Sequence, residues 1–226
     1  MASSSVSSVS VKEQIILAAE RLLAEHGLDG ASLRQISAAA GNGNNTAVQY
    51  HFGSKQTLIQ AIFEYRLRDL NARRDALVDE RRPRDVRSWV ACHVVPVLEQ
   101  GERDGSRYLS FVAKLQQHGR RDVLDRLAPE LLAPTTRFRT EVGALLAGVP
   151  EPLRGHRIAR ATAFAVHAGA EREQSRARAE QVLPFAAHAG DLLDGIVGFL
   201  QAPVSPATLT ALDTAPPHAE ALSLHP

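Results

Sequence analysis

Residues 42–56 read NGNNTAVQYHFGSKQ, and this stretch decides how the N-terminal part of the chain folds. It opens with a glycine among three asparagines, residues that tolerate positive φ and therefore favour a turn. Asn45 is then placed to cap a short helix over residues 46–52, because its side-chain oxygen can accept a hydrogen bond from a free N–H group of the first turn. The stretch thus predicts a turn that leads directly into a helix.

The helix over residues 46–52 has two different faces. Val48 and Phe52 lie four residues apart and would face inward. Gln49 and Tyr50 cannot share that face, so they would form an exposed polar and aromatic ridge. A helix held by two apolar anchors can therefore present its polar side to a partner.

Two further helices precede this one. Ser10 and Glu13 form a capping-box pattern, and apolar residues follow at helical spacing as far as Gly27. Ser32 opens a shorter helix, which Gly41 ends. Two helices joined by a glycine turn, with the second polar on its outer side, predict a helix-turn-helix whose second helix enters the DNA major groove.

The rest of the chain also reads as helices. Ser54 caps a long helix with an apolar stripe, which should link the first module to the rest, and its arginines are expected outside or at the edges of that stripe. The termini, residues 1–9 and 203–226, lack a periodic apolar pattern and are expected to be flexible. Gly and Pro signals separate further helices over residues 84–100, 105–119, 128–148, 153–178 and 182–201.

The composition is that of a soluble globular protein, with 226 residues, 44% hydrophobic and 23% charged. The formal net charge of +1 gives no overall polybasic signature. The single cysteine, Cys92, excludes an internal disulfide and a cysteine-rich zinc site, which suits the cytoplasm. No signal peptide is visible, and Asp191 and Asp194 interrupt the most hydrophobic late stretch, so we expect no membrane span.

Several side chains of the first module suit contacts with DNA. The Gln49 amide can pair with adenine N6 and N7, Thr46 and Ala47 can meet a thymine methyl, and exposed N–H groups near the start of the second helix can bind phosphate. Helix-turn-helix shapes also occur as plain packing units, and residues 1–60 carry four basic and four acidic side chains, so this alternative stays open. The candidate DNA-binding residues are Ser32, Arg34, Asn44, Asn45, Thr46, Ala47, Gln49, Tyr50, His51 and Lys55.

A family resemblance joins these observations. SVKEQIILAAERLLAEHGLDGASLRQISAAAG, followed by NNTAVQYHFGSKQTLIQAIF, resembles the N-terminal domain of TetR (tetracycline repressor) family transcriptional regulators over residues 10–63. The resemblance rests on the Gly-x-x-Gly-x-Ser link, the Ala-Ala-Gly stop and the Tyr-His-Phe-x-Ser-Lys junction, which occur together and in order. It implies an all-helical homodimer, a DNA-reading third helix and a C-terminal domain that binds a small effector. The turn from Gly41 to Asn45 is one residue longer than the commonest family pattern, so the base-contacting positions can shift by one.

The last two predicted helices carry small residues through their apolar faces, which lets helices approach closely. Members of the TetR family pair through a four-helix bundle made from their last two long helices, so the resemblance implies self-association here. An intramolecular core is the alternative. The candidate dimer-interface residues are Ala161, Ala165, Ala168, Phe185, Ala189, Leu192, Ile196 and Phe199.

The middle helices supply apolar and mixed side chains for an effector site between bundle helices. Cys92 and His93 are adjacent, so they diverge by about 100° on a helix and do not form a metal site. His167 and Glu171 could share a face, but exposed pairs of this kind are routine, and no enzyme motif supports them. We therefore predict no catalytic residue, metal or cofactor. The candidate effector-binding residues are Trp89, His93, Phe111, Leu115, Gln116 and Phe138.

Taken together, the sequence predicts an all-α, ligand-responsive transcriptional repressor that binds palindromic operator DNA as a homodimer. The alternative is a helical ligand-binding protein or enzyme whose first module only packs. The expected parts are a flexible N-terminus (1–9), the helix-turn-helix DNA-binding domain (10–56), the effector-binding and dimerisation domain (57–202) and a flexible tail (203–226).

Overall fold

The computed structural model describes residues 10–41, 47–119, 123 and 126–214 of the chain. These residues form helices and no strand, which confirms the predicted all-α class. The helices are α1 (Val11–Gly30), α2 (Leu33–Ala39), α3 (Ala47–Phe52), α4 (Lys55–Arg81), α5 (Val86–Glu102), α6 (Tyr108–Gln117), α7 (Pro129–Leu145), α8 (Leu153–Ala177), α9 (Phe185–Gln201) and α10 (Pro206–Asp213).

The first helices begin at the predicted capping residues. The Ser10 hydroxyl accepts a hydrogen bond from the Glu13 N–H at 3.2 Å, and the Glu13 carboxylate accepts one from the Ser10 N–H at 2.9 Å. Gly27 was expected to end α1, but with φ at 76° it forms a kink, after which the helix resumes as far as Gly30. Gly41, with φ at 72°, follows α2 in the left-handed conformation that the sequence predicts.

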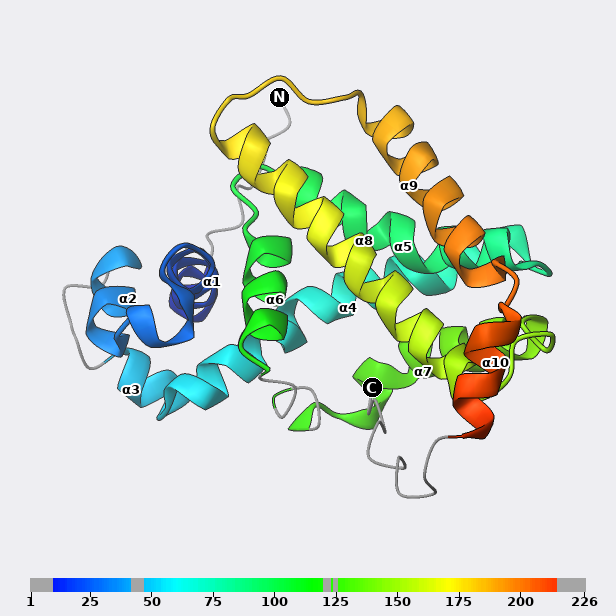
Figure 1. Cartoon of the computed structure of the whole chain (residues 1–226). Helices are drawn as coiled ribbons and strands as arrows, with labels where there is room; N and C mark the ends of the chain where they lie inside the picture. Colours follow the sequence, from blue (N-terminus) through cyan, green and yellow to red (C-terminus); the bar gives the residue numbers. More distant parts are fainter. Residues whose placement is uncertain (1–9, 42–46, 120–122, 124–125, 215–226) are drawn as a thin grey trace.

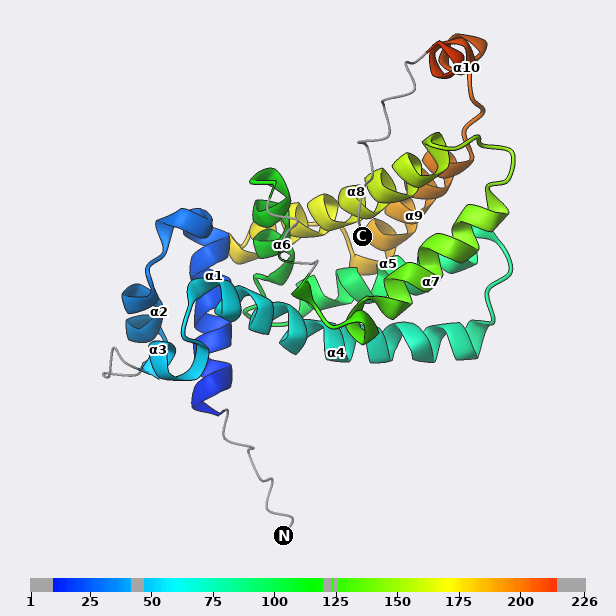
Figure 2. The ribbon, with the colours of Figure 1, turned by 90° about the horizontal axis from the view of Figure 1, so that it is seen from below.

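The helices are arranged as a small module at one end and a larger bundle (Figure 1). Helices α1 to α3 form the module, and α4 runs out of it into the bundle, where it packs on α5 and α7 (Figure 2). Helix α6 lies between the two parts and packs on both α1 and α8. Two helices therefore connect the module with the bundle.

The apolar core of the module continues into the bundle. Side chains of α1 to α4 share one cluster of buried residues with side chains of α6 and α8. Phe111 of α6 is fully buried there, with its ring centroid 5.5 Å from that of Phe63 in α4. A second cluster joins α5, α7, α8 and α9. Because the first cluster extends from the module into the bundle, a shift of α6 would displace side chains of the module core.

Helices α5, α6 and α8 approach closely around Leu109. A Cβ atom on Gly169 of α8 would lie 2.5 Å from Leu109 Cδ1, and one on Gly101 of α5 would lie 2.9 Å from the same atom. Since real Cβ atoms do not approach so near, both positions need glycine unless Leu109 shifts. The small residues of α8 thus serve packing within the chain here.

The tail differs from the expectation of a flexible segment, because residues 206–213 form α10. The Ser205 hydroxyl accepts a hydrogen bond from the Thr208 N–H at 3.2 Å, and Pro206 occupies the first turn, where its missing N–H is no loss. These local signals are sufficient for a short helix, although it buries no residue. In the described part of the chain, no single helix has the length and apolar composition to cross a membrane, whereas α9 and α10 together, bent by 57° at their break, meet those criteria.

Candidate functional site

Helix α3 presents a polar face to solvent. Val48 and Phe52 anchor it in the module core at 0% and 6% exposure, as the spacing predicts. Gln49, Tyr50 and His51 are exposed, and Tyr50 retains 85% of its accessible surface. An exposed aromatic residue on a polar helix is available to a partner. Of the other predicted DNA contacts, Asn44, Asn45 and Thr46 lie outside the described residues, and Ala47 is half-buried at the start of α3.

The start of α2 offers fewer free N–H groups than the sequence suggests. The Ser32 hydroxyl accepts from the Gln35 N–H at 3.2 Å, and the Gln35 side-chain oxygen accepts from the Ser32 N–H at 2.8 Å. This capping box satisfies two donors that the sequence analysis left for phosphate. The exposed Arg34 side chain remains available there, and Lys55 is half-buried at the first position of α4.

Lys12 adds a positive charge that the sequence analysis did not assign to the site. Its ammonium lies 5.9 Å from the centroid of the Phe52 ring, so the N-terminal end of α1 lies beside α3. Only the tertiary fold brings these two residues together, so no local sequence pattern predicts the contact.

Three of the four acidic residues in residues 1–60 lie away from α3 or are buried. Glu25 and Asp29 follow Lys12 by 13 and 17 residues on α1, or about 20 Å and more at 1.5 Å per residue, although the kink at Gly27 intervenes before Asp29. Figure 2 shows α1 running away from α3 toward that far end. Glu20 is buried and paired inside the protein. Glu13 lies next to Lys12 at the start of α1, where its carboxylate accepts from the Ser10 N–H, so the separation of charge holds for Glu20, Glu25 and Asp29 only.

The ion pair of Glu20 connects the module with the bundle. Its two carboxylate oxygens accept hydrogen bonds from Nε and Nη2 of Arg66, each at 2.7 Å. One of these oxygens also accepts from the Arg107 N–H, just before α6, at 3.1 Å. Both side chains are buried, at 1% exposure for Glu20 and 7% for Arg66. A single carboxylate thus joins α1, α4 and the start of α6.

A cavity of about 390 Å³ lies within the bundle. Helices α4, α5, α6, α7 and α8 line it, mostly with apolar side chains, and its size is ordinary for a small-molecule site. His93 and Gln116 line this cavity, and both belong to the set predicted for the effector. Tyr108, Thr135 and His167 also line the cavity, although no sequence pattern assigned them to an effector site.

The other four predicted effector residues do not line the cavity. Phe111 and Leu115 are on the side of α6 that packs into the module core, so they contact other core residues instead. Trp89 and Phe138 line a smaller hollow beside the cavity, where the Arg137 guanidinium lies 5.5 Å from the Trp89 ring centroid. Periodicity indicates that a residue faces inward but not which of several inner surfaces it reaches.

Arg74 is the most unexpected residue in the cavity wall. The arginines of α4 were expected outside or at the edges of its apolar stripe, whereas Arg66 and Arg74 are both buried. Arg74 is 6% exposed and lines the cavity together with His93. Burial lowers the pKa of Arg74 to about 10, so its guanidinium stays charged at neutral pH.

His93 accepts one of the hydrogen bonds of Arg74. Its Nε2 atom lies 3.1 Å from Nη2 of Arg74, and since arginine only donates, this nitrogen must carry no proton. Burial and the neighbouring Arg74 charge lower the pKa of His93 well below its usual value, which keeps the ring neutral. The ring also stacks on Phe138, with centroids 4.0 Å apart and planes 6° from parallel.

The predicted dimer interface needs correction. Ala161, Ala165, Ala189, Leu192 and Ile196 are buried inside the single chain in the cluster of α5, α7, α8 and α9. Their stripe is therefore intramolecular core, the alternative that the sequence left open. Ala168 and Phe185 are half-buried against the same cluster.

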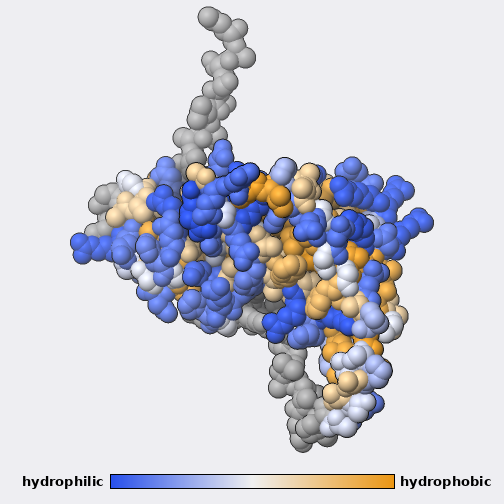
Figure 3. All heavy atoms as spheres, turned by 45° about the horizontal axis from the view of Figure 1, so that its top comes forward, coloured by the Kyte–Doolittle hydropathy of each residue, from blue (hydrophilic) through white to orange (hydrophobic). Residues whose placement is uncertain are grey.

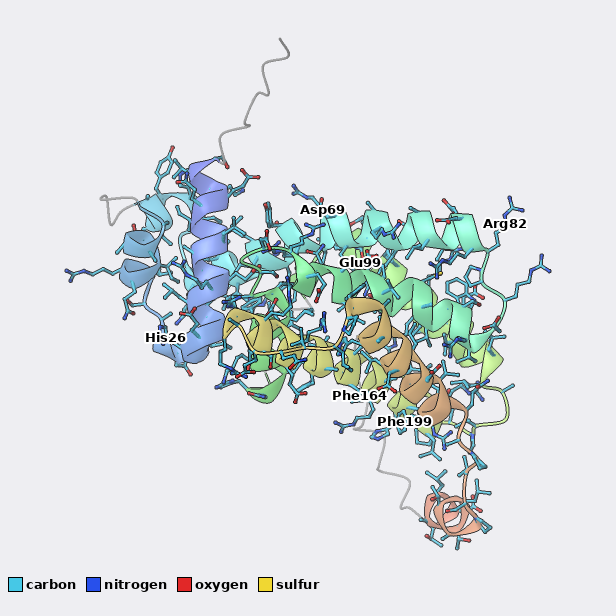
Figure 4. The ribbon with its side chains drawn as sticks, turned by 90° about the horizontal axis from the view of Figure 1, so that it is seen from above. His26, Asp69, Arg82, Glu99, Phe164 and Phe199 are labelled. Atoms are coloured by element: carbon cyan, nitrogen blue, oxygen red, sulfur yellow. The ribbon has the colours of Figure 1, made fainter. Side chains whose placement is uncertain are left out.

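A different face of α8 and α9 is open. Phe199, from the predicted set, is 44% exposed, and Phe164, which the sequence analysis did not select, is 52% exposed. Figure 4 shows both on the same side of the packed pair α8 and α9. Figure 3 shows hydrophobic residues reaching the surface in this part of the molecule, while the module is largely hydrophilic. The open face, rather than the buried stripe, can meet another molecule.

The residues considered for enzyme or metal chemistry have ordinary surroundings. The Cys92 thiol is buried, and burial raises its pKa. Nδ1 of His167 lies 2.9 Å from the Ala163 carbonyl, and Glu171 is exposed. Within the described ranges, no group of three or more His, Cys, Asp or Glu side chains is placed to hold a metal ion.

Comparison with known proteins agrees with this architecture. Residues 15–62 match the family model of bacterial regulatory proteins, tetR family. A transcriptional regulator from Rhodococcus sp. Rha1 is 24% identical with a TM-score of 0.55, over 87% of this chain and 100% of its own. The fatty acid degradation regulator FadR from Bacillus halodurans is 16% identical with a TM-score of 0.55, over 83% and 94%. No curated protein sequence matches the chain.

A putative TetR-family regulator from Rhodococcus sp. shares the fold as well, at 15% identity and a TM-score of 0.50, over 84% of this chain and 98% of its own. The helix-turn-helix with its exposed third helix lies within the residues that match the family model, and it is joined to a helical bundle. Residues 15–62 are therefore similar to the tetR family of bacterial regulatory proteins, and the chain as a whole shares the helical fold of the solved regulators.

Proposed function

We propose that the chain is a ligand-responsive repressor that binds palindromic operator DNA as a homodimer in the cytoplasm. The observation that carries this proposal is α3, whose exposed Gln49, Tyr50 and His51 stand on a helix anchored by two buried apolar side chains. Such a rigid helix can enter the major groove, where the Gln49 amide suits adenine N6 and N7. Lys12, Arg34 and Lys55 surround it as phosphate contacts.

The open face of α8 and α9 supports dimerisation. Gly190, Gly195 and Gly198 of α9 have open space where a Cβ would lie. Each glycine weakens an exposed helix by about 1 kcal/mol relative to alanine, and no close packing within the single chain requires these three glycines. The exposed Phe164 and Phe199 flank this surface. A second copy packed on the same face would bury both phenylalanines and use the close approach that glycine permits.

The connection between cavity and module supports ligand control. Helix α4 carries Arg66, which pairs with Glu20 of the module, and Arg74, which lines the cavity. Helix α6 also lines the cavity. Arg107, the residue just before it, donates its backbone N–H to the Glu20 carboxylate. A ligand that favours one position of these helices changes the separation of two α3 helices in a dimer. By linkage, operator DNA must weaken ligand binding by the same factor.

Footprinting on DNA near the promoter of the protein's own gene tests the proposed DNA binding. We expect two related half-sites, with their centres about 34 to 36 Å apart, because a two-fold dimer presents α3 twice. Gln49→Ala should relax base choice at a cost of about 1 to 3 kcal/mol, whereas Lys55→Ala should weaken all sequences alike and reduce the salt slope by about 1. Arg81→Ala, at the exposed far end of α4, is the matched control. A footprint without paired half-sites contradicts the proposal.

The dimer face has its own test. Phe164→Glu and Phe199→Glu place carboxylates on exposed positions, so the chain should fold normally but become monomeric in sedimentation. Leu145→Glu is the control, since Leu145 is similarly exposed, at 42%, but lies at the end of α7. If both phenylalanine variants remain dimeric, the interface lies elsewhere.

A further inference from the structure

Arg74 is a buried cation that has only neutral partners. Its Nε donates to the His93 carbonyl at 3.2 Å, and its Nη2 donates to Nε2 of the neutral His93 ring at 3.1 Å. Nη1 donates to Oδ1 of Asn71 at 3.3 Å and to Oγ1 of Thr135 at 3.4 Å. Among the described residues, no carboxylate lies within 4.0 Å of its guanidinium. Hydrogen bonds satisfy most of the donors, whereas the exposed Asp75 carboxylate acts on the charge only through space, without an ion pair.

The rest of the cavity wall offers Arg74 no negative partner, since none of the described lining residues is Asp or Glu. Burying a charge without a partner is costly, so proteins normally pair such groups. Arg66 on the same helix follows that rule, because Glu20 pairs with it. An anion bound in the cavity would pair with the Arg74 guanidinium, as the Glu20 carboxylate pairs with that of Arg66.

The hydrogen bonds of Arg74 leave room for such an anion. The two longest, at 3.3 and 3.4 Å, both start from Nη1, and Nη2 has a second N–H beyond the one given to His93. A carboxylate could therefore bind through Nη1 and Nη2 together, the fork geometry that arginine favours. Asn71 also donates to the Leu131 carbonyl of α7 at 2.8 Å. If a carboxylate replaced Asn71 as the partner of Nη1, the hydrogen bonds between α4 and α7 would change as well.

The cavity also contains an unsatisfied amide. Oε1 of Gln116 is buried and has no hydrogen-bond partner within the described part of the chain. The neighbouring wall is apolar, with Leu67, Leu70, Val97 and Val112. The site therefore combines one cation without an ion-pair partner and a mainly hydrophobic body, which matches a molecule with an ionised head and an apolar remainder. The Gln116 oxygen is an acceptor, so it would bind a donor elsewhere on the ligand and not the carboxylate.

We propose that the ligand of this cavity is an amphipathic carboxylate, with its carboxylate on the Arg74 guanidinium and its apolar part against α4, α5 and α6. This inference rests on the proposed function insofar as the cavity is the effector site, and it adds the chemical class of the effector. The structure selects a monoanion of moderate size, since a cavity of about 390 Å³ encloses a small molecule and Arg74 is the deeply buried charge.

Calorimetric titration of the full-length protein without DNA tests the ligand class. The probes are octanoate, decanoate and 4-phenylbutanoate, each with the alcohol of the same carbon skeleton. At pH 7.5 we expect at least one carboxylate to bind about 10- to 100-fold more tightly than its alcohol, the range of hydrogen bonds to a charged group. Arg74→Met should reduce this preference to near unity while the alcohol keeps its affinity. Arg73→Met is the matched control, because Arg73 neighbours Arg74 on α4 but is exposed and paired with Glu99.

Three results would overturn the proposal: equal affinity for each acid and its alcohol, a preference that survives Arg74→Met, or no binding by any of the three acids. Titrating operator DNA with the protein saturated by the best carboxylate separates this inference from the proposed function. If the preference depends on Arg74 but DNA affinity does not change, the carboxylate site is supported and ligand-responsive repression fails. If only a neutral compound binds and releases DNA, repression is supported and the carboxylate class fails.

Discussion

Arg66 and Arg74 occupy equivalent places on one helix and have opposite electrostatic surroundings. They lie eight residues apart on α4, or about 12 Å, and their exposures are 7% and 6%. Arg66 makes two hydrogen bonds of 2.7 Å to a buried carboxylate. Arg74 makes its hydrogen bonds to a carbonyl, an amide, a hydroxyl and a neutral imidazole.

The Arg66 charge is part of the folded structure, whereas the Arg74 charge is available to a ligand in the cavity. The Arg66 region is complete within the chain, because Glu20 holds α1, α4 and the start of α6 together. Arg74 has hydrogen-bond acceptors for most of its N–H groups but no carboxylate in an ion pair with it. Helix α4 thus has a fixed end at the module and an end that an anion can change, and three predictions test this contrast.

Removing Arg66 should have the largest effect. Arg66→Met leaves the Glu20 carboxylate buried with the Arg107 N–H as its remaining partner, so we expect a loss of about 3 to 5 kcal/mol in the free energy of unfolding. Urea denaturation measures this loss. Arg68→Met, at an exposed position of the same helix, should change stability by less than about 0.5 kcal/mol. Similar losses in the two variants would refute the structural role of the pair.

The neutral partner of Arg74 should give a pH dependence of intermediate size. The pKa of His93 is lowered in the folded state, so below its ordinary value near 6.5 the unfolded chain binds a proton that the folded chain does not. Stability from this group is present above pH 6.5 and falls with pH below it, by up to about 1.4 kcal/mol per unit, or about 2 kcal/mol at pH 5.

Urea titrations of the wild type and of His93→Gln between pH 7 and pH 5 isolate this contribution. His188, whose pKa burial also lowers, is present in both proteins and cancels in the difference. The wild type should lose stability more steeply than the variant. Parallel curves would mean that His93 takes up its proton in the folded state.

Removing Arg74 should have the smallest effect on stability. Arg74→Met deletes a buried charge that has no ion-pair partner, which is favourable, and leaves acceptors at His93, Asn71 and Thr135 with one donor fewer, which is unfavourable by about 1 to 3 kcal/mol. These terms oppose each other, so the free energy of unfolding should stay within about 1 kcal/mol of the wild type. A loss as large as that of Arg66→Met would show that Arg74 is structural and would remove the contrast.

The sequence predicts the module well because its signals are local. The caps at Ser10, Ser32 and Ser54 require residues only three positions away, and the inward faces of Val48 and Phe52 follow from one helical period. The kink at Gly27 shows the limit, since a positive φ can interrupt a helix without ending it. Local chemistry determines where these elements begin and which side faces inward.

The sequence predicts the cavity and the outer face of the bundle poorly because these depend on contacts distant along the chain. Arg74 reads as a charge beside an apolar stripe until α5 and α7 cover it with His93 and Thr135. Ile196 and Leu192 form an apolar stripe that suits a dimer as well as a core, and the packing of α9 on α5 and α8 decides for the core. Phe164 belongs to no regular pattern, so its exposure could not be read from spacing.

If the proposed dimer forms on the open face of α8 and α9, the three glycines of α9 make amide exchange in that helix depend on protein concentration. A helix with Gly190, Gly195 and Gly198 on an uncovered face opens easily, so its backbone amides should exchange with deuterium sooner than those of α5, which is buried on several sides. Covering that face with a second copy closes it. Exchange in α9 should therefore slow as the protein is concentrated while α5 stays unchanged, and a dilute monomer would first become open to proteases at α9.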